Sequence, residues 1–154
     1  MSQDFLIRLL ADGIMVPIVL IAIYVLVFKI KNNKRIESYS RILVAGLTAY
    51  LLAKLIAVIF QPAIERPFEA LGTTAGASFL SNPGFPSDHM LFATAILCAV
   101  WFETRNKNIS LVLAILTILV GVGRVLALVH TPIDIIGGVL IALFSSVWYL
   151  NNKQ

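Results

Sequence analysis

Charged residues are scarce in this sequence. They make up 13% of the 154 residues, whereas hydrophobic residues make up 59%. A soluble domain of this length needs a much larger polar surface, so the composition argues against a soluble protein and predicts an integral membrane protein. The length favours a single domain over residues 1–154.

Cysteine is nearly absent as well, because Cys98 is the only one in the chain. A single cysteine forms neither an internal disulfide nor a thiolate metal cluster, and its apolar neighbours predict a buried structural thiol. No arrangement of Asp, Glu and His resembles a cage for a divalent metal, so we expect no metal and no cofactor. The net charge of +4 is spread over connecting segments, which is not the pattern of a nucleic-acid-binding protein. No cleavable signal peptide is evident near the start of the chain.

Long apolar segments predict membrane spans, for which about 20 mostly apolar residues suffice. We expect five, at Ile14–Phe28, Ile42–Phe60, Asp88–Phe102, Ile109–Val129 and Ile133–Leu150. The mixed segment Ser2–Asp12 is either an amphipathic helix on the membrane surface or a frayed terminus. The predicted fold class is therefore all-α, an integral membrane bundle of about five transmembrane helices with or without an N-terminal interfacial helix.

Basic residues predict the orientation of these spans. The strongest basic cluster is Lys29–Arg35, followed by Arg41, and the positive-inside rule places it in the cytoplasm. The long connection Gln61–Pro86 then lies outside, and its prolines favour a shaped loop. We expect a multi-pass protein of the cell membrane.

The stretch Gly123–Asp134 places three ionisable residues in apolar surroundings. Such groups mark functional sites in membrane proteins. Thr131 and Pro132 are typical of a helix start, with Asp134 three residues after the cap. This geometry leaves His130 at the helix mouth, close to Asp134. An alternative is that Asp134 only completes a capping box and His130 is a solvated loop residue.

On the predicted topology, polar residues from three separate segments meet at the outer membrane surface. The helix starts after Ser87 and Thr131 offer free backbone N–H groups, which suit an anion. Arginine matches phosphate oxygens, and two histidines suggest a nucleophile and a general acid. The pattern predicts a phosphoryl-transfer site formed by Lys54, Arg66, Ser87, Asp88, His89, Arg124, His130 and Asp134.

The same residues resemble the signature of the type 2 phosphatidic acid phosphatase superfamily, which is K-x6-RP, then PSGH, then SR-x5-H-x3-D. The third element is present as Arg124-x5-His130-x3-Asp134, the second as Pro86-Ser87-Asp88-His89 and the first as Arg66-Pro67. The phrase from Phe85 to His89 looks like the undecaprenyl-diphosphate phosphatases of the bacitracin-resistance type, which carry this aspartate.

Three positions depart from the signature. Ile59 stands where the spacing expects lysine, and Lys54 lies five residues earlier. Lys54 reaches the phosphate only if the backbone at Gln61-Pro62 bends it back. Gly123 replaces the serine before Arg124, which removes a hydroxyl donor, and Asp88 replaces a glycine.

The resemblance implies a metal-independent reaction in two steps. His130 attacks phosphorus, Asp134 orients it, and His89 protonates the leaving oxygen and then activates water. Arg66 and Arg124 clamp the phosphate, with help from Ser87. The substrate is a lipid phosphate in the bilayer, with undecaprenyl diphosphate favoured over phosphatidic acid and phosphatidylglycerophosphate.

Two further classes stay open. One is an inactive lipid-binding or transport relative, because the phosphate pocket departs from the signature. The other is a b-type haem protein with His89 and His130 as ligands. The sequence does not indicate an oligomeric state.

Overall fold

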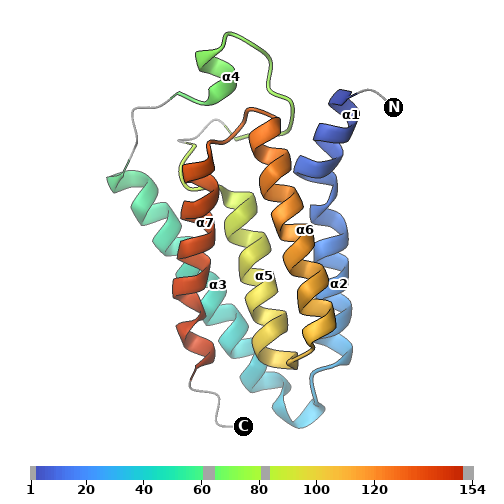
Figure 1. The fold of residues 1–154 in the computed structure, drawn as a ribbon. Coiled ribbons are helices and arrows are strands. Elements are labelled where there is room, and N and C mark those ends of the chain that lie inside the picture. Colours follow the sequence, from blue (N-terminus) through green and yellow to red (C-terminus); the bar gives the residue numbers. More distant parts are fainter. Residues whose placement is uncertain (1–2, 61–64, 81–83, 151–154) are drawn as a thin grey trace.

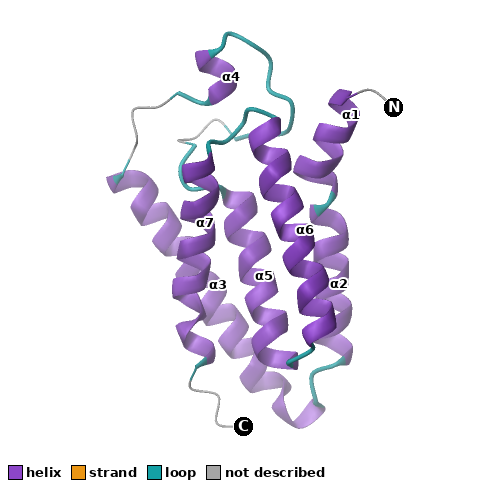
Figure 2. Ribbon diagram, in the orientation of Figure 1, coloured by secondary structure: helices purple, strands orange, loops and turns teal. Residues whose placement is uncertain are grey.

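The computed structural model describes residues 3–60, 65–80 and 84–150, and these residues form helices and loops without a strand (Figures 1 and 2). The long helices run alternately up and down, and the short helix α4 lies with loops at one end of the bundle (Figure 1). The helical elements are α1 (Gln3–Arg8), the π-turn η1 (Leu9–Gly13), α2 (Met15–Phe28), η2 (Asn32–Lys34), α3 (Arg35–Ile59), α4 (Pro67–Ala70), α5 (Asp88–Thr104), α6 (Lys107–Leu126), α7 (Pro132–Ser145) and η3 (Ser146–Tyr149).

Among the described residues, four helical stretches are long and apolar enough to cross a membrane. They are Gln3–Phe28, Asn32–Ile59, Lys107–Leu126 and Pro132–Tyr149. The fifth long helix, α5, has 17 residues and packs against α2, α3, α6 and α7, so it forms the centre of the bundle. The prediction of an all-α membrane bundle is confirmed.

The sequence suggested that the N-terminal segment is either a surface helix or a frayed end. The described part of this segment is neither. It is continuous with the first span, because α1, η1 and α2 together form one apolar stretch of 26 residues. The N–H of Ile14 donates to the carbonyl of Leu9 over 3.0 Å, which carries the helical hydrogen bonding through the π-turn.

Two helix boundaries differ from the prediction for identifiable reasons. Helix α3 begins at Arg35 instead of Ile42 because its polar first turns have partners: Arg41 binds both Glu37 and Glu103. Helix α6 ends at Leu126 because the chain turns sharply afterwards, with Leu128 at a φ of 59°. That turn leaves a short link that carries His130.

The connection between α3 and α5 folds over the end of α6. The N–H of Phe68 donates to the carbonyl of Leu128, and that of Gly76 donates to Ala127, both over 3.0 Å. Beneath these bonds lies a small apolar core formed by Ala11, Phe68, Ala77, Ala127 and Val129. The described part of this loop therefore has a defined fold, as its prolines predicted. Residues 61–64 and 81–83 lie outside the described residues, and so does the predicted bend at Gln61-Pro62.

The starts of α5 and α7 lie side by side. The N–H of Ser87 donates to the carbonyl of Asp134 over 3.0 Å. The close approach depends on Gly138, where a Cβ atom would lie 2.6 Å from the Ser87 carbonyl oxygen and 2.9 Å from the Leu91 nitrogen. Both helix N-termini therefore open at the same end of the bundle. They lie beneath the connection between α3 and α5, whose described residues 65–80 and 84–87 are called the loop cap below.

Large apolar side chains cover the outside of the bundle. Exposed examples lie on every long helix and include Leu20, Val58, Phe92, Ile118 and Phe144. In water such a surface would be an aggregation site. In a bilayer it is the expected lipid-facing surface, because helices satisfy their own backbone hydrogen bonds there.

Candidate active site

A polar pocket of about 270 Å³ opens at the end of the bundle where α5 and α7 begin. Its walls come from the loop cap, the start of α5, the end of α6 and the link before α7. The predicted site residues among its lining are Arg66, Asp88, His89, Arg124 and His130, joined by Ser78, Phe79, Leu80, Gly84 and Pro86. The fold thus brings residues that are far apart in the sequence into one small space.

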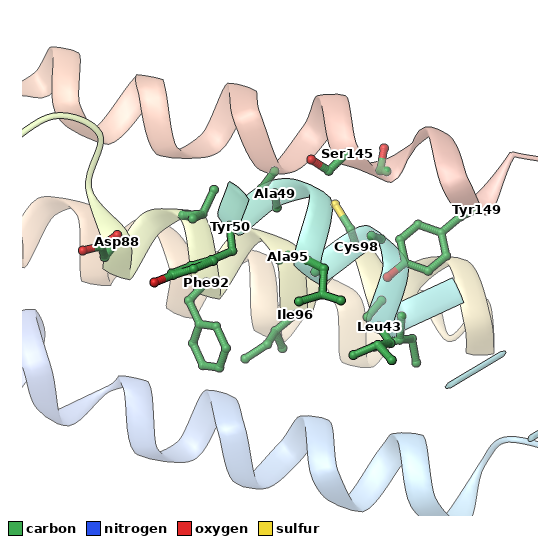
Figure 3. A pocket seen from close by; sticks show the side chains of 18 of the residues that line it. Leu43, Ala49, Tyr50, Asp88, Phe92, Ala95, Ile96, Cys98, Ser145 and Tyr149 are labelled. Atoms are coloured by element: carbon green, nitrogen blue, oxygen red, sulfur yellow. The ribbon is translucent and has the colours of Figure 1, made fainter. Parts of the chain in front are cut away.

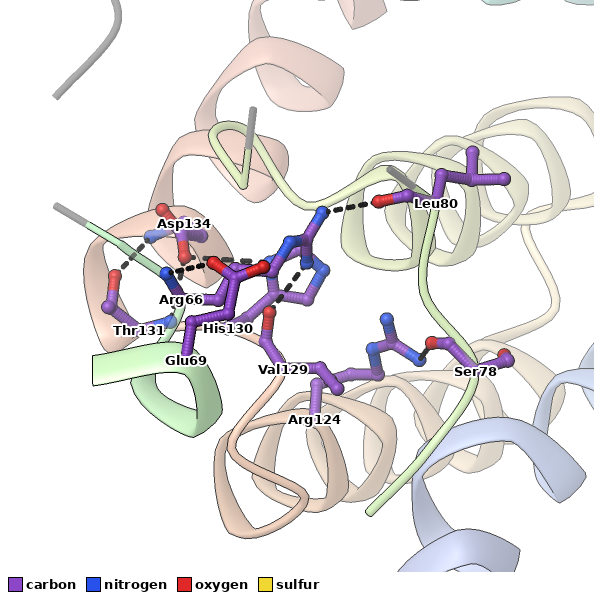
Figure 4. A network of polar contacts seen from close by, with 9 residues as sticks. All are labelled: Arg66, Glu69, Ser78, Leu80, Arg124, Val129, His130, Thr131 and Asp134. Carbon is purple, nitrogen blue, oxygen red and sulfur yellow. Dashed lines mark hydrogen bonds and ion pairs between the residues drawn. The ribbon is translucent and has the colours of Figure 1, made fainter. Parts of the chain in front are cut away.

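His130 and Asp134 form a buried pair at the mouth of α7. The Nδ1 atom of His130 lies 3.5 Å from Oδ2 of Asp134, an ion-pair separation that is long for a hydrogen bond. The same Oδ2 accepts from the N–H of Thr131 over 2.7 Å, and the Thr131 hydroxyl accepts from the N–H of Asp134. The predicted capping box is present, and Asp134 both caps the helix and faces the imidazole (Figure 4).

The surroundings of His130 favour its neutral form. Only 5% of the residue is exposed, and this burial lowers the pKa of His130, with Arg124 and Arg66 acting in the same direction against the carboxylate of Asp134. A neutral imidazole whose Nδ1 faces a carboxylate has Nε2 available as a nucleophile. The alternative of a solvated loop histidine does not fit this burial.

Arg124 is the largest side chain that is almost completely buried, with 1% exposed. Its Nη1 donates to Asp12 and to the carbonyl of Ser78, each over 2.8 Å. Its Nε has no hydrogen-bond partner among the described residues. A buried guanidinium donor without a partner costs free energy, which an anion in the pocket would recover.

Arg66 joins the loop cap to the link before α7. Its Nη1 donates to the carbonyl of Val129 over 2.7 Å and its Nη2 to that of Leu80 over 3.0 Å (Figure 4). The first bond holds the backbone next to His130. Arg66 therefore fixes the shape of the pocket in addition to supplying positive charge to its wall.

Ser87 is at the N-cap position of α5, as predicted, but its hydroxyl makes no capping hydrogen bond. The residue is 0% exposed, and its Oγ has no partner among the described residues. Ser87 lies directly before the pocket residues Asp88 and His89 but does not itself line the pocket.

Lys54 lies outside the polar pocket. Its Nζ is 3.1 Å from Oδ1 of Asp88, and both side chains are more than a third exposed. Lys54 therefore reaches the site through Asp88, which does line the pocket. Replacement of the signature's glycine by Asp88 provides this partner.

A residue that the sequence reasoning did not select, Asp12, also enters the site. Its Oδ1 lies 2.8 Å from Nη1 of Arg124 and 3.6 Å from Nε2 of His89. The available signal was a single acidic residue at the edge of an apolar span, which is too common a pattern to single out.

A second, larger cavity of about 680 Å³ adjoins the polar pocket. Almost all of its lining is apolar, and it runs between α3, α5 and the end of α7 (Figure 3). Leu80 and Asp88 line both cavities, and Lys54 lines the larger one. Polar and apolar spaces thus meet at the Lys54–Asp88 pair.

Among the described residues, no group of three or more His, Cys, Asp or Glu side chains is arranged to hold a metal ion. The cations of the polar pocket are those of Arg66 and Arg124. The arrangement can bind an anion, offer a neutral imidazole and place a second imidazole nearby.

Comparisons with known proteins identify a family and a relative. A profile of the PAP2 superfamily matches residues 38–154. A protein of Bacillus subtilis (strain 168), undecaprenyl-diphosphatase BcrC, is 32% identical over 111 residues, which are 70% of this chain and 55% of the relative. The matched part thus spans about half the length of that relative. No solved structure matches. Because the family match extends over most of the chain and includes all the motif residues of the polar pocket, the protein belongs to the PAP2 superfamily.

Proposed function

We propose that this protein is a lipid phosphate phosphatase whose preferred reaction is hydrolysis of undecaprenyl diphosphate to undecaprenyl phosphate. The observation that carries the proposal is the polar pocket, in which two histidines and two arginines from distant segments line one space of about 270 Å³. Family membership and the printed name of the Bacillus subtilis relative support the same activity.

The positions of the side chains support a reaction in two steps. Nε2 of His130 attacks phosphorus, so that a P–N bond forms while the P–O bond to the leaving group breaks. The proton of His89 passes to the leaving oxygen, and in the second step His89 accepts a proton from the water that attacks phosphohistidine. Asp134 stabilises the charge that develops on His130. Positioning and charge stabilisation are the main demands of phosphoryl transfer.

The arginines take the role that a metal ion has in other phosphatases. Arg124 offers its buried Nε, and Arg66 adds positive charge to the same pocket. The N-termini of α5 and α7 add backbone N–H groups and partial positive charge. Ser87 is placed beside this region with an unused hydroxyl. No metal is needed in this mechanism.

The apolar cavity supports a lipid as the substrate. Because Leu80 and Asp88 line both spaces, the two cavities are close enough for a phosphate to lie in one and a hydrocarbon chain in the other. Lys54 and Asp88 stand at the border, where they would contact the second phosphate of a diphosphate. Phosphatidic acid and phosphatidylglycerophosphate have a glycerol at this position, and they are the competing substrates.

We place the site at the extracytoplasmic surface of the membrane. The basic residues Lys29, Lys31, Lys34, Arg41 and Arg105 line a cavity at the other end of the bundle, and the positive-inside rule puts that end in the cytoplasm. A cysteine at Thr73, in the loop cap, should react with an impermeant thiol reagent in intact cells, while one at Asn32 should be shielded. The reverse labelling would place the site inside.

The test of the function is a set of purified lipid phosphates. Undecaprenyl diphosphate, phosphatidic acid and phosphatidylglycerophosphate are given to wild-type protein and to His130→Ala, with and without EDTA. We expect phosphate release from undecaprenyl diphosphate at the highest kcat/KM, unchanged by EDTA and absent in His130→Ala. Binding without release from any substrate would instead identify an inactive lipid-binding relative, and loss of activity in EDTA would contradict the mechanism.

A further inference from the structure

The N-terminal π-turn η1 brings an acidic side chain into the polar site. Asp12 belongs to this turn, and it lies outside residues 38–154, the part of the chain that the family profile matches. A π-turn inside a helix is rare and is frequent at functional sites. The family signature therefore says nothing about Asp12, and its role has to come from its contacts.

Asp12 uses both carboxylate oxygens. Oδ2 accepts from the N–H of Ser78 over 2.9 Å, and Oδ1 accepts from Nη1 of Arg124 over 2.8 Å. Oδ1 also lies 3.6 Å from Nε2 of His89. The carboxylate thus joins the loop cap, α6 and α5 at one point, and the side chains of His89 and Asp12 are each about a quarter exposed.

Gly123 permits this placement. A Cβ atom at that position would lie 2.5 Å from the nitrogen of Ala11 and 2.6 Å from the carbonyl carbon of Leu10. Backbone atoms cannot yield at such distances without a shift of η1. The glycine that replaces the signature's serine therefore lets the π-turn rest directly on α6, and one residue further along η1 is Asp12. The close contact at Gly123 thus helps to hold Asp12 beside Arg124 and His89.

An acidic group in a phosphate pocket opposes substrate binding by charge repulsion, so its presence needs a compensating role. A carboxylate near an imidazole favours the protonated ring. Four charged or titratable groups act on His89: Asp12 and Asp88 favour its protonation, whereas Arg124 and His130 oppose it. Burial of the ring opposes protonation most strongly, so the two carboxylates are what offset it. His89 has to carry a proton before it can act as a general acid.

We propose that Asp12 is a positioning residue that orients His89 and raises its affinity for the proton that it transfers to the leaving oxygen. The proposal rests on the phosphatase function proposed above. In the first step the proton moves from His89 to the leaving oxygen as the P–O bond breaks and the P–N bond to His130 forms. The site then contains two His–Asp pairs, one for the nucleophile and one for the acid.

The test compares substrates whose leaving groups differ in their need for a proton. A long-chain alkyl phosphate releases an alcohol and needs the proton, whereas p-nitrophenyl phosphate releases a stable phenolate. The variants are Asp12→Asn, which keeps the shape and an acceptor for Ser78, and Asp12→Glu, which keeps the charge. Asp4→Asn is the matched control, an exposed acidic residue in the same N-terminal stretch.

We expect Asp12→Asn to lower kcat for the alkyl phosphate by about 10-fold to 10³-fold, since an opposite charge within about 4–6 Å shifts a pKa by about 1–3 units. The kcat for p-nitrophenyl phosphate should stay near that of wild type, and KM should not rise for either substrate because a repulsive charge is removed. The basic limb of the pH profile for the alkyl phosphate should move to lower pH. Asp12→Glu should recover part of the loss, and Asp4→Asn should match wild type.

Equal losses on both substrates, or a higher KM with an unmoved pH profile, would mean that Asp12 only anchors the fold, and the inference would be wrong. If wild-type protein releases phosphate from neither substrate nor from the lipid phosphates, the proposed function fails instead. The two failures are therefore distinguishable, because the first requires an active wild-type enzyme.

Discussion

Two arginines at opposite ends of the bundle, Arg41 partly buried and Arg124 buried, show how differently the same side chain is used. Arg41 donates through Nε and Nη2 to the two carboxylate oxygens of Glu103, each over 2.8 Å, and through Nη1 to Glu37. Arg124 binds Asp12 and Ser78 through Nη1 alone and leaves its buried Nε without a partner among the described residues. The N–H donors of Arg41 are bound by carboxylates of the protein, whereas Arg124 keeps a donor that a ligand could use.

This difference separates stability from activity. The side chain of Glu103 is 1% exposed and depends on Arg41 for its compensation. At the other end, an unmet guanidinium N–H costs about 1–3 kcal/mol, which the fold tolerates and a bound phosphate would recover. Loss of Arg41 should therefore lower stability and leave turnover unchanged, whereas substitutions in the polar pocket should mainly lower turnover, and the following predictions test this.

The largest effect is expected at His130. His130→Ala should abolish turnover and the phosphoenzyme, because no other group replaces the nucleophile.

The variant His89→Ala should lower kcat for an alkyl phosphate by about 10²–10⁴-fold, the usual contribution of general acid–base catalysis. It should still form phosphohistidine from p-nitrophenyl phosphate. The measurement is acid-labile phosphate trapped on each variant, with unfolding temperatures as the control. Label that persists in His130→Ala and disappears in His89→Ala would show that the two roles are reversed.

The next effect should appear in stability and not in chemistry. Arg41→Met leaves the carboxylate of Glu103 buried without its partner, and breaking a buried ion pair in this way costs about 3–5 kcal/mol. The turnover per folded molecule should be unchanged, since Arg41 does not line the polar pocket. Unfolding in detergent measures the loss, and the exposed Lys31→Met is the matched control. A stable Arg41→Met protein with low kcat would contradict the separation of the two ends.

Asp134 combines both roles in one residue. Asp134→Asn should keep the capping bond to the Thr131 N–H, which an amide oxygen can also accept. It removes the charge that supports His130, so kcat should fall by about 10-fold to 10³-fold. Asp134→Ala should lose the cap as well and destabilise the protein by about 1 kcal/mol more. Equal stability losses in the two variants, without a loss of kcat in Asp134→Asn, would reduce Asp134 to a capping residue.

The sequence predicted the pocket residues that lie on the helices of the bundle. Ionisable groups in apolar segments and helix-start patterns can be recognised from neighbouring residues alone. The cap at Thr131, Pro132 and Asp134 and the start of α5 after Ser87 are examples. The family signature then joined these local patterns into one site. The all-α membrane bundle followed from composition and from the lengths of the apolar segments.

Residues whose role depends on contacts between distant segments were beyond this reasoning. The contact of Asp12 with Arg124 joins residues 112 positions apart, and it depends on a π-turn and on Gly123. The position of Lys54 was likewise not predictable from its shifted spacing, because it depends on the contact with Asp88. The boundary of α3 moved to Arg35 because of the pairing between Arg41 and Glu103, which is also non-local.

The smallest expected effect is a shift in pH dependence that tests the environment of His130. Burial lowers the pKa of His130 below its usual value of about 6.5, and only the neutral ring attacks phosphorus. As the pH falls, the ring therefore stays reactive past pH 6.5 and is lost only when the pH passes its lowered pKa. The burst of p-nitrophenol release, measured by stopped flow, should accordingly lose its rate only at a lower pH than a histidine of usual pKa would allow. Asp134→Asn removes the carboxylate that favours the protonated ring, so its acid limb should move to still lower pH while its plateau rate falls. Using one substrate for both proteins cancels the ionisation of the substrate itself, and the limb should persist in His89→Ala if it belongs to His130. A limb that moves to higher pH in Asp134→Asn, or vanishes in His89→Ala, would assign the titrating group elsewhere.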